Sequence, residues 1–451
     1  MGEMDADATS VLAAEEGGRY TAVDLFCGAG GLTLGARMAG FRVLFGVDID
    51  PWACQTYRAN NPRVECYQGD IAGLDPSKLR RKLGLEPGEL DLLLGGPPCE
   101  GFSIYAPERY IEDPRNHLFR HYLAFVREFR PKFVLMENVP GMLSLGNGTF
   151  IRAIMRALED LGYKVGMRVL NAANYGVPQD RWRVFIVGTA LDGAEPLFPQ
   201  PTHYAPVRAN FTGGRVFTVS ATQPDVFGVL KRFVTVGEAI GDLPALRAGE
   251  GSEVMPYDKE PHSEYARMMR EGSKYVYNHV APKLSKINLE RLKYIPPGGS
   301  WRDIPFDLLP PGMRRARRSD HTKRYGRLRA DGLAATILGK CDPHWGPVFH
   351  YEQDRTLTVR EEARLQSFPD WYRFYGPRMA QYEQVGNAVP PLLAKALCGL
   401  IRRQLSGDPI GEGGAVRAIS LEEVEAFYEE RASVRRIAKV ESSTKVELFS
   451  R

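Results

Sequence analysis

Short apolar segments recur through the first 190 residues, and each is followed closely by a glycine or an acid. The segments that fit β-strands are residues 20–26, 41–47, 64–67, 90–94, 133–136 and 183–187. Helices are expected between them, over 32–39 and from Asp50-Pro51, where an acid precedes proline at the first helical position. This alternation predicts an α/β fold with a doubly wound, mostly parallel sheet, which binds ligands at the carboxyl ends of its strands.

The pattern changes after Gly188. Residues 196–350 are rich in Pro, Gly, Arg and Tyr and lack clear periodicity, which predicts a second, smaller domain of irregular β-structure and loops. Helical periodicity returns at 358–367 and 391–404. We therefore expect a tail (1–18), a first domain (19–195), a second domain (196–350), a return to the first domain (351–405), and a linker with a C-terminal helix (406–451).

The expected C-terminal helix has a clear start. Ser420 followed by Glu423 forms a capping-box pattern. Behind it, four apolar residues recur at helical spacing: Leu421, Val424, Phe427 and Tyr428. This stripe predicts a helix that packs on the outside of the first domain.

Composition excludes several classes of protein. Hydrophobic residues make up 43% of the chain and charged residues 25%, which excludes a disordered chain, and no apolar run approaches the roughly 18 residues of a membrane helix. The six cysteines are scattered without a CxxC pair. Such usage is typical of a reduced, cytoplasmic protein, and it argues against a structural zinc site.

Charge is concentrated in one segment. Residues 281–330 hold thirteen Lys or Arg and four Asp or Glu, a net charge of +9 in a chain whose total is +4. A basic segment on a mildly acidic body favours a polyanionic partner, most commonly nucleic acid. A solvated surface laced with salt bridges is the alternative.

Residues that follow the first three strands suggest a nucleoside site. The turn from Asp24 to Gly31 is not a GxGxxG motif, because Thr33 stands where the third glycine would fall. A pyrophosphate cradle is therefore disfavoured, and with it a dehydrogenase. Asp48 and Asp70 end the next two strands, where acids can bind ribose hydroxyls and an adenine amino group; caps of the following helices are the alternative.

The next strand ends suggest catalytic groups. Cys99 follows two prolines that hold the backbone rigid, although an isolated cysteine is more often a small buried apolar residue. Glu137 ends another strand and fits a general acid if burial keeps it protonated. Arg181 and Arg183 are two residues apart, so both point to one face of a strand and can fix Glu137 or a substrate carbonyl.

These pieces, in this order, resemble the DNA (cytosine-5)-methyltransferase family. The matching segments are DLFCGAGG at 24–31, VDID at 47–50, GD at 69–70, GGPPCEGFS at 95–103, ENV at 137–139, QDRWR at 179–183, RTLTVREEARLQSFPD at 355–370 and QVGNAVPP at 384–391. The resemblance covers about residues 20–405. It implies a Rossmann-like methyltransferase domain, with residues 196–350 as the domain that recognises the target sequence. One departure is Glu100, where the family usually has glutamine.

The resemblance also implies a cofactor and roles for individual residues. The cofactor is S-adenosylmethionine, which leaves as S-adenosylhomocysteine, and no metal is implied. Its expected contacts are Phe26, Gly28, Gly30, Gly31, Asp48, Ile49, Asp70, Ile71, Pro98, Asn387, Ala388 and Val389. The expected catalytic residues are Cys99 as nucleophile, Glu137 at the cytosine ring nitrogen, and Arg181 and Arg183 to hold the base and the glutamate.

Double-stranded DNA is the implied partner, with a cognate restriction endonuclease acting on the same site; the expected state is a monomer in the bacterial cytoplasm. The expected DNA contacts are Ser103, Arg115, Arg314, Arg315, Arg317, Arg318, Arg327, Arg329 and Thr336. The dense run at 314–318 predicts phosphate contacts. Arg327 and Arg329, near the segment from Tyr325 to Thr336, are the expected readers of base edges.

Three other functions compete with this prediction. A tRNA-methylating relative shares the fold, but such relatives tend to carry a Cys-Phe-Thr tripeptide that this chain lacks. A non-enzymatic DNA-binding regulator on the same fold predicts loss of the cysteine or the glutamate, and both are present. A zinc cytosine deaminase requires a P-C-x-x-C motif, but Phe102 stands at the position of the second cysteine.

Overall fold

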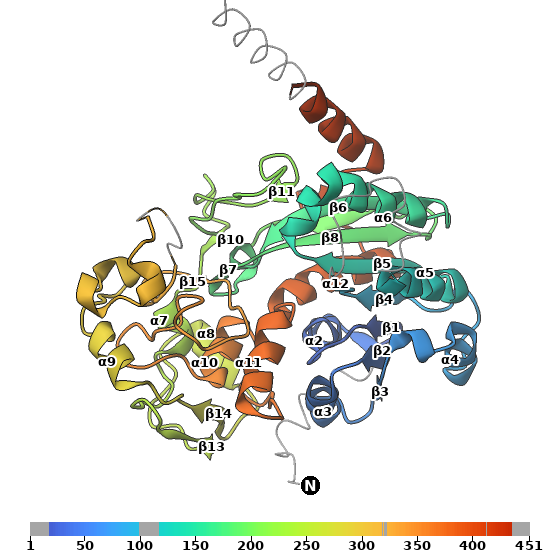
Figure 1. The fold of residues 1–451 in the computed structure, drawn as a ribbon. Coiled ribbons are helices and arrows are strands. Elements are labelled where there is room, and N and C mark those ends of the chain that lie inside the picture. Colours follow the sequence, from blue (N-terminus) through green and yellow to red (C-terminus); the bar gives the residue numbers. More distant parts are fainter. Residues whose placement is uncertain (1–17, 99–116, 318, 320–322, 412, 435–451) are drawn as a thin grey trace, which may run out of the picture.

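The computed structural model describes residues 18–98, 117–317, 319, 323–411 and 413–434. Its centre is an eight-stranded sheet in the order β11-β6-β8-β5-β4-β1-β2-β3 (Figure 1). The strands are β1 (Tyr20–Leu25), β2 (Phe41–Asp48), β3 (Glu65–Gln68), β4 (Leu92–Gly95), β5 (Phe133–Asn138), β6 (Lys164–Asn171), β8 (Trp182–Thr189) and β11 (Thr218–Val219). Only β8 runs antiparallel to its neighbours in this sheet, so the predicted mostly parallel sheet is confirmed.

Alternate residues of the strands enter two separate apolar cores. In β1, Ala22 joins the core beneath α2 and α12, whereas Val23 and Leu25 join the core on the opposite face. This is the period of two that a strand buried on both faces requires. The helices around the sheet are α2 (Gly31–Met38), α3 (Pro51–Asn60), α4 (Pro76–Lys82), α5 (His117–Phe129), α6 (Thr149–Glu159) and α12 (Pro391–Ser406).

The six predicted strands are all present, with ends that shift by one or two residues. The predicted start of α3 is confirmed, because the Asp50 carboxylate accepts the N–H of Ala53 at 2.6 Å. The strand β6 was missed. Lys164 and Arg168 interrupt its apolar pattern, and Arg168 reaches outward to the carbonyl of Arg417.

A second lobe lies beside the carboxyl ends of the parallel strands in Figure 1 and contains more helix than expected. Its helices are α7 (Val236–Ile240), α8 (Glu264–Arg270), α9 (Lys286–Leu292), α10 (Val359–Leu365) and α11 (Arg378–Asn387). Its strands pair as β13 (Gly251–Met255) with β14 (Val276–Val280), and β10 (His203–Tyr204) with β12 (Lys231–Arg232). The helix α10 lies within the predicted 358–367, whereas α7, α8 and α9, of five to seven residues, are too short for apolar periodicity to reveal.

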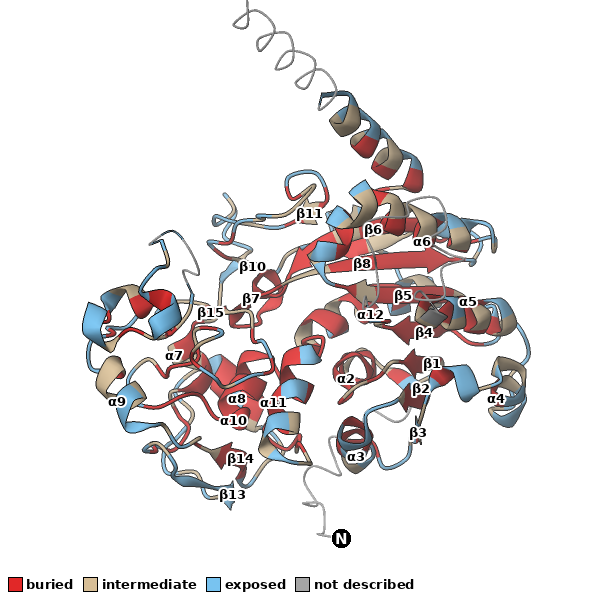
Figure 2. Ribbon diagram, in the orientation of Figure 1, coloured by how far each residue is buried: buried red, intermediate tan, exposed pale blue. Residues whose placement is uncertain are grey.

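A buried ion network joins α7 to α10. The Arg364 guanidinium donates to Asp242 at 2.5 Å and to Asp370 at 2.6 Å, and all three side chains are excluded from solvent. Such a network is costly to break, because each charge depends on its partners. Figure 2 shows α10 as buried and α9 as a mixture of intermediate and exposed residues.

The C-terminal segment packs more deeply than the sequence suggested. The strand β16 (Ala415–Arg417) pairs with β9 (Leu197–Pro199), and a helix follows over 421–434. Ser420 and Glu423 form the predicted capping box. Val424 and Tyr428 are buried in the core beneath the sheet, with the hydroxyl of Tyr428 donating to the carbonyl of Leu143 at 2.5 Å. Within the described ranges, no helix is both long and apolar enough to cross a membrane.

Candidate active site

A cavity of about 640 Å³ opens at the carboxyl ends of the parallel strands. Eleven of the twelve residues predicted to contact the cofactor line it: Phe26, Gly28, Gly31, Asp48, Ile49, Asp70, Ile71, Pro98, Asn387, Ala388 and Val389. Glu137 and Arg183 line the same cavity. The structure therefore gathers segments that lie up to about 360 residues apart into one site.

The glycine turn after β1 forms the floor of this cavity. Phe26 has φ of 61°, a left-handed conformation that a bulky residue rarely adopts. Gly28 follows with φ of 52°, and its N–H donates to Asp48 Oδ2 at 2.8 Å. A Cβ at Gly31 would lie 2.2 Å from the carbonyl oxygen of Val389, so glycine there lets the 384–391 segment close against the turn.

Gly30 differs from the other predicted contacts, because it does not line the cavity. It caps α2 with φ of 93°, and a Cβ there would lie 2.6 Å from the hydroxyl of Tyr372. That hydroxyl donates to the carbonyl of Ala29. The glycine thus permits close packing of the turn against Tyr372, and the predicted contact with the methionine part of the cofactor is not seen in the lining of the cavity.

The two strand-end acids accept backbone N–H groups and also border the cavity. Asp70 Oδ1 accepts the N–H of Ala72 at 2.9 Å and caps a short 3-10 helix, Ile71–Gly73. Asp48 Oδ1 accepts the N–H of Asp50 at 2.9 Å. Burial raises the pKa of Asp48. Both carboxylates nevertheless border the cavity, where they provide acceptors for a polar ligand.

Glu137 and Arg183 form a mostly buried ion pair at the end of β5. Arg183 Nε lies 2.8 Å from Glu137 Oε1. Burial raises the pKa of Glu137, although the positive charges of Arg183 and Arg181 oppose the shift. A Cβ at Gly96 would approach Glu137 Oε2 to 3.2 Å, so glycine there gives the carboxyl room beside the Pro97-Pro98 turn. The Asn138 amide ties that turn down by donating to the carbonyl of Pro97 at 3.0 Å.

Arg181 does not hydrogen-bond to Glu137, which corrects the expectation that it holds the glutamate directly. Its guanidinium is fully buried and donates to the carbonyls of Ile337 (3.1 Å), Gly386 (2.7 Å) and Ala388 (3.1 Å). Arg181 therefore joins the backbone at Ile337 to the 384–391 segment. Its charge is close enough to lower the pKa of Glu137 and acts there through space.

The sequence did not reveal the amides that share this junction with Arg181. Gln179 is buried in β7 (Gln179–Asp180); its amide donates to Gln366 Oε1 at 2.9 Å, and its oxygen accepts the N–H of Ile337. The amide of Gln366 donates in turn to the carbonyl of Val385 at 2.7 Å. A buried amide produces no periodic pattern in the sequence. Only their positions within the QDRWR and RLQSFPD motifs could have identified Gln179 and Gln366.

Three cysteines that are distant in sequence meet beside the cavity. Cys27, Cys54 and Cys66 form one buried cluster with Tyr57. Burial raises the pKa of the Cys27 thiol to about 12. Cys27 borders the cavity as a neutral thiol and lacks the thiolate that a nucleophile needs.

The predicted DNA contacts occupy different environments. Arg327 is mostly buried and donates to the carbonyls of Ile295, His350 and Glu352 and to Asp354, so its guanidinium is engaged within its own lobe rather than directed to solvent. Arg314 donates to the carbonyls of Asp307 and Leu309. Thr336, beside β15 (Ala334–Ala335), donates to the carbonyl of Asp180 at 2.8 Å.

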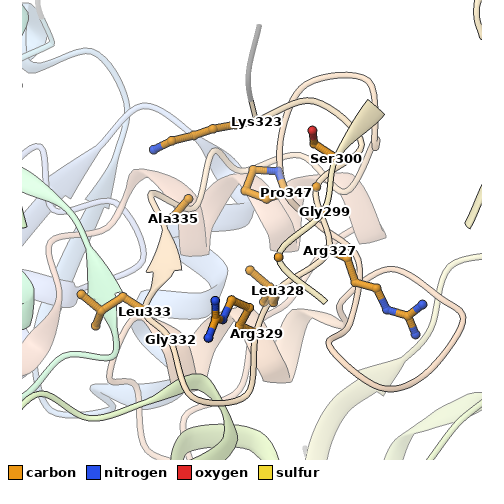
Figure 3. Close-up of a pocket in the computed structure, with 12 residues that line it drawn as sticks. Gly299, Ser300, Lys323, Arg327, Leu328, Arg329, Gly332, Leu333, Ala335 and Pro347 are labelled. Atoms are coloured by element: carbon orange, nitrogen blue, oxygen red, sulfur yellow. The ribbon is translucent and has the colours of Figure 1, made fainter. Parts of the chain in front are cut away.

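Arg329 keeps its side chain in solvent, and Arg315 is also exposed. Among the described residues Arg329 is paired with the exposed Asp331 at 2.7 Å, a contact of little strength. Together with Lys323 it borders a small cavity of about 220 Å³ whose rim includes Gly298, Gly299 and Gly332 (Figure 3). In Figure 3 the Arg327 guanidinium points away from Arg329. Cys99, Ser103, Arg115 and Arg318 lie outside the described residues.

Comparison with known proteins identifies the family. Residues 20–403 match the family of C-5 cytosine-specific DNA methylases. The chain belongs to this family. The type II methyltransferase M.AgeI of Thalassovita gelatinovora is 37% identical over 435 residues, which span 85% of this chain and 99% of that relative. M1.HphI of Haemophilus parahaemolyticus is 38% identical over 379 residues, or 84% and 85% of the two chains.

A solved structure shares the fold of this methylase. It is described as a DNA modification methyltransferase encoded within an E. coli prophage. It aligns with a TM-score of 0.63 and 25% identity, covering 86% of this chain and 99% of its own. The predicted class of fold and the predicted enzyme class, a DNA cytosine-5 methyltransferase, are thereby confirmed.

Proposed function

We propose that the protein transfers a methyl group from S-adenosylmethionine to carbon 5 of one cytosine in a specific sequence of duplex DNA. The observation that carries the proposal is the shared cavity. The glycine turn and the acids Asp48 and Asp70 line one part, while Pro98, Glu137 and Arg183 line another. A site for a nucleoside-bearing donor is thus continuous with a buried carboxyl–guanidinium pair.

The lining of the cavity fits the proposed donor. A Cβ at Gly28 would meet no protein atom within 4 Å, so the backbone there opens into the cavity and admits a bulky group. Asp48 and Asp70 are placed to accept bonds from ribose hydroxyls and the adenine amino group. When bound, the donor supplies an electrophilic methyl group on a sulfonium cation. The carboxylates around the cavity favour that positive charge.

The residues of the chain then activate the cytosine. Cys99, which directly follows Pro98, adds as a thiolate to carbon 6, and carbon 5 of the ring becomes nucleophilic. Glu137 donates a proton or hydrogen bond to ring nitrogen 3 and absorbs the developing charge. Arg183 holds the Glu137 carboxyl in place through their 2.8 Å ion pair. After methyl transfer, loss of the carbon 5 proton expels the cysteine.

A cytosine within a stacked duplex is out of reach of such a cavity, so the base must be flipped out. We assign target recognition to residues 196–350, with Arg315, Arg317, Arg318 and Arg329 as candidate DNA contacts and Ser103 and Arg115 as contacts near the flipped base. By analogy with the type II relatives, we also propose a cognate restriction endonuclease as functional partner. The expected setting is a monomer in the cytoplasm.

Bisulfite sequencing of DNA from cells that express the chain tests activity and target together. We expect one short sequence to become methylated at a single cytosine. Cys99→Ser should abolish methylation and covalent trapping by 5-fluorocytosine DNA, while donor binding persists. Cys341→Ser, which changes a half-buried cysteine outside the cavity, is the matched control and should behave like the native protein. Near-normal turnover by Cys99→Ser would overturn the mechanism, and methylation of tRNA but not DNA would favour the alternative substrate.

A further inference from the structure

Three apolar side chains protrude together from the loop between β11 and β12. Val226 is 97% exposed, Phe227 89% and Val229 77%, which makes them the three most exposed large hydrophobic residues in the described part of the chain. Single exposed apolar residues are common on protein surfaces, but a contiguous group marks an interaction site. We call Val226, Phe227 and Val229 the apolar tip.

The apolar tip is held in one conformation by the backbone. The Asp225 carboxylate accepts the N–H of Val229 at 3.1 Å and of Leu230 at 2.8 Å. The N–H of Gly228 donates to the carbonyl of Asp225 at 3.2 Å, and Gly228 adopts φ of 67°. These bonds close a tight turn and lower the pKa of Asp225. The tip is therefore preorganised for a contact outside the chain.

The stem of the loop stands where the two lobes meet. Its strand β12 pairs with β10, which Figure 1 draws beside β7 and β15. Phe233, just after β12, packs against Ala173 and Val207 in a cluster that also contains Trp182 and Leu333. Trp182 separates Arg181 from Arg183, and Leu333 precedes β15. The loop that carries the apolar tip is thus anchored through Phe233 in the same cluster as Trp182 of β8 and Leu333 beside β15.

Size and charge favour DNA over a protein partner. A stable protein interface engages about 20–30 residues on each side, far more than this tip offers. A wedge that enters a base-pair step needs only one or two apolar side chains. Residues 201–235 hold four Lys or Arg and one acid, Asp225, whose carboxylate is engaged by backbone N–H groups. Lys231 and Arg232 form half-exposed ion pairs with Glu264 and Glu238, and Arg208 and Arg215 add further positive charge. This balance suits a surface that approaches phosphates.

We propose that Phe227, flanked by Val226 and Val229, inserts between adjacent base pairs of the duplex and unstacks the step as the cytosine leaves the helix. The proposal rests on the DNA methylation proposed above. It assigns part of base extrusion to a loop outside the catalytic cavity. Unstacking is the step that a wedge assists, because a base that is already unpaired or mismatched costs less to extrude.

The test compares Phe227→Ala with Tyr275→Ala, an exposed aromatic of similar size next to β14. Single-turnover methyl transfer is measured on a paired duplex and on the same duplex with an abasic site opposite the target cytosine. We expect Phe227→Ala to be slower by about tenfold or more on the paired duplex and near-native on the abasic one. Tyr275→Ala should match the native protein on both.

A second measurement requires only that the protein binds the duplex, without methyl transfer. With 2-aminopurine scanned along the duplex, native protein should raise fluorescence at the unstacked step, and Phe227→Ala should raise it less while keeping its melting temperature. An equal defect on both duplexes, no defect, or unchanged fluorescence would overturn the wedge. Absence of methyl transfer by the native protein would instead overturn the proposed function, since the fluorescence comparison does not depend on it.

Discussion

Two buried carboxyl groups at the strand ends differ in their partners. Glu137 is paired with Arg183 at 2.8 Å, whereas Asp24 accepts one bond from the Thr33 hydroxyl at 2.6 Å, and its Oδ1 has no hydrogen-bond partner among the described residues. Burial raises the pKa of both, that of Asp24 to about 7. Glu137 lines the cavity, while Asp24 lies beneath the glycine turn. Glu137 is therefore suited to catalysis, whereas Asp24 makes the stability of the fold depend on pH.

Glu137→Gln should slow methyl transfer by roughly 100- to 10,000-fold in single-turnover kinetics, with DNA affinity little changed. The raised pKa keeps the native acid protonated to higher pH than an exposed glutamate. Its contribution is therefore lost as pH rises through that pKa. The native rate should show this alkaline decline, and the variant should not. An effect below about threefold would contradict the role.

Asp24→Asn should make the protein less sensitive to pH. The unfolded Asp24 ionises near 3.8 and the folded one near 7, so its stabilising effect is complete below pH 3.8 and is lost as pH rises to about 7. The loss is of the order of a few kcal/mol, since one pKa unit is worth about 1.4 kcal/mol. Thermal melts at pH 5 and pH 8 measure it. The exposed Asp258→Asn should keep the native dependence, and equal slopes for the two variants would contradict the prediction.

At the scale of elements, the helix over 421–434 is part of the main core. Tyr428 is buried against η4 (Pro140–Gly148), where a Cβ at Gly148 would lie only 2.2 Å from its ring. Phe427 lies edge-on to Phe217 with ring centroids 4.7 Å apart. The segment beyond the 384–391 motif therefore stabilises the sheet far from the cavity.

Tyr428→Ala should reduce the free energy of unfolding by about 3–5 kcal/mol, the usual cost of removing a buried aromatic ring. Chemical denaturation measures it, with the exposed Glu429→Ala as control. Methyl transfer should remain at the same target sequence in the variant. A shifted target, or a loss no larger than that of the control, would show that the helix has another role.

At the scale of the whole molecule, the sheet and the second lobe meet at a shared junction. On the side of the sheet, Arg181 reaches across this junction through a bond to Gly386, and Gln179 through a bond to Ile337. On the other side, Arg327 supports its own lobe, while Arg315 and Arg329 reach solvent. The three arginines should therefore differ when mutated.

Arg327→Ala should lower the melting temperature, because it leaves three carbonyl groups without their donor. Arg315→Ala should weaken binding to all duplexes and reduce the salt slope by about one. Arg329→Ala should relax the choice of target. Methylation mapping at two salt concentrations separates these outcomes. If Arg315→Ala altered the target and Arg329→Ala did not, the two roles would be reversed.

Strand ends and motif residues were predictable because they obey local rules. Asp50 caps α3 as its sequence indicates, and the predicted contacts at or just after the ends of β1, β2, β3 and β4, apart from Gly30, line one cavity, because parallel strands bring their carboxyl ends to the same edge. Asn387, Ala388 and Val389 join them from the end of α11. The short helices α7 and α8 were missed, although Thr235 and Ser263 cap them, because they contain less than two turns of periodic pattern.

The sequence by itself determined the sheet, the family motifs and the identity of the residues at the cavity. Only the tertiary structure decided which hydrogen-bond donor pairs with which acceptor. Arg327 could not be told from Arg329 by type or spacing, but one faces four acceptors and the other faces solvent. Likewise, Arg183 meets Glu137 while Arg181, two residues earlier, holds three carbonyls. Periodicity sets which face a side chain takes, whereas its partners come from other segments of the chain, as far as 207 residues away for Arg181, about which local sequence carries no information.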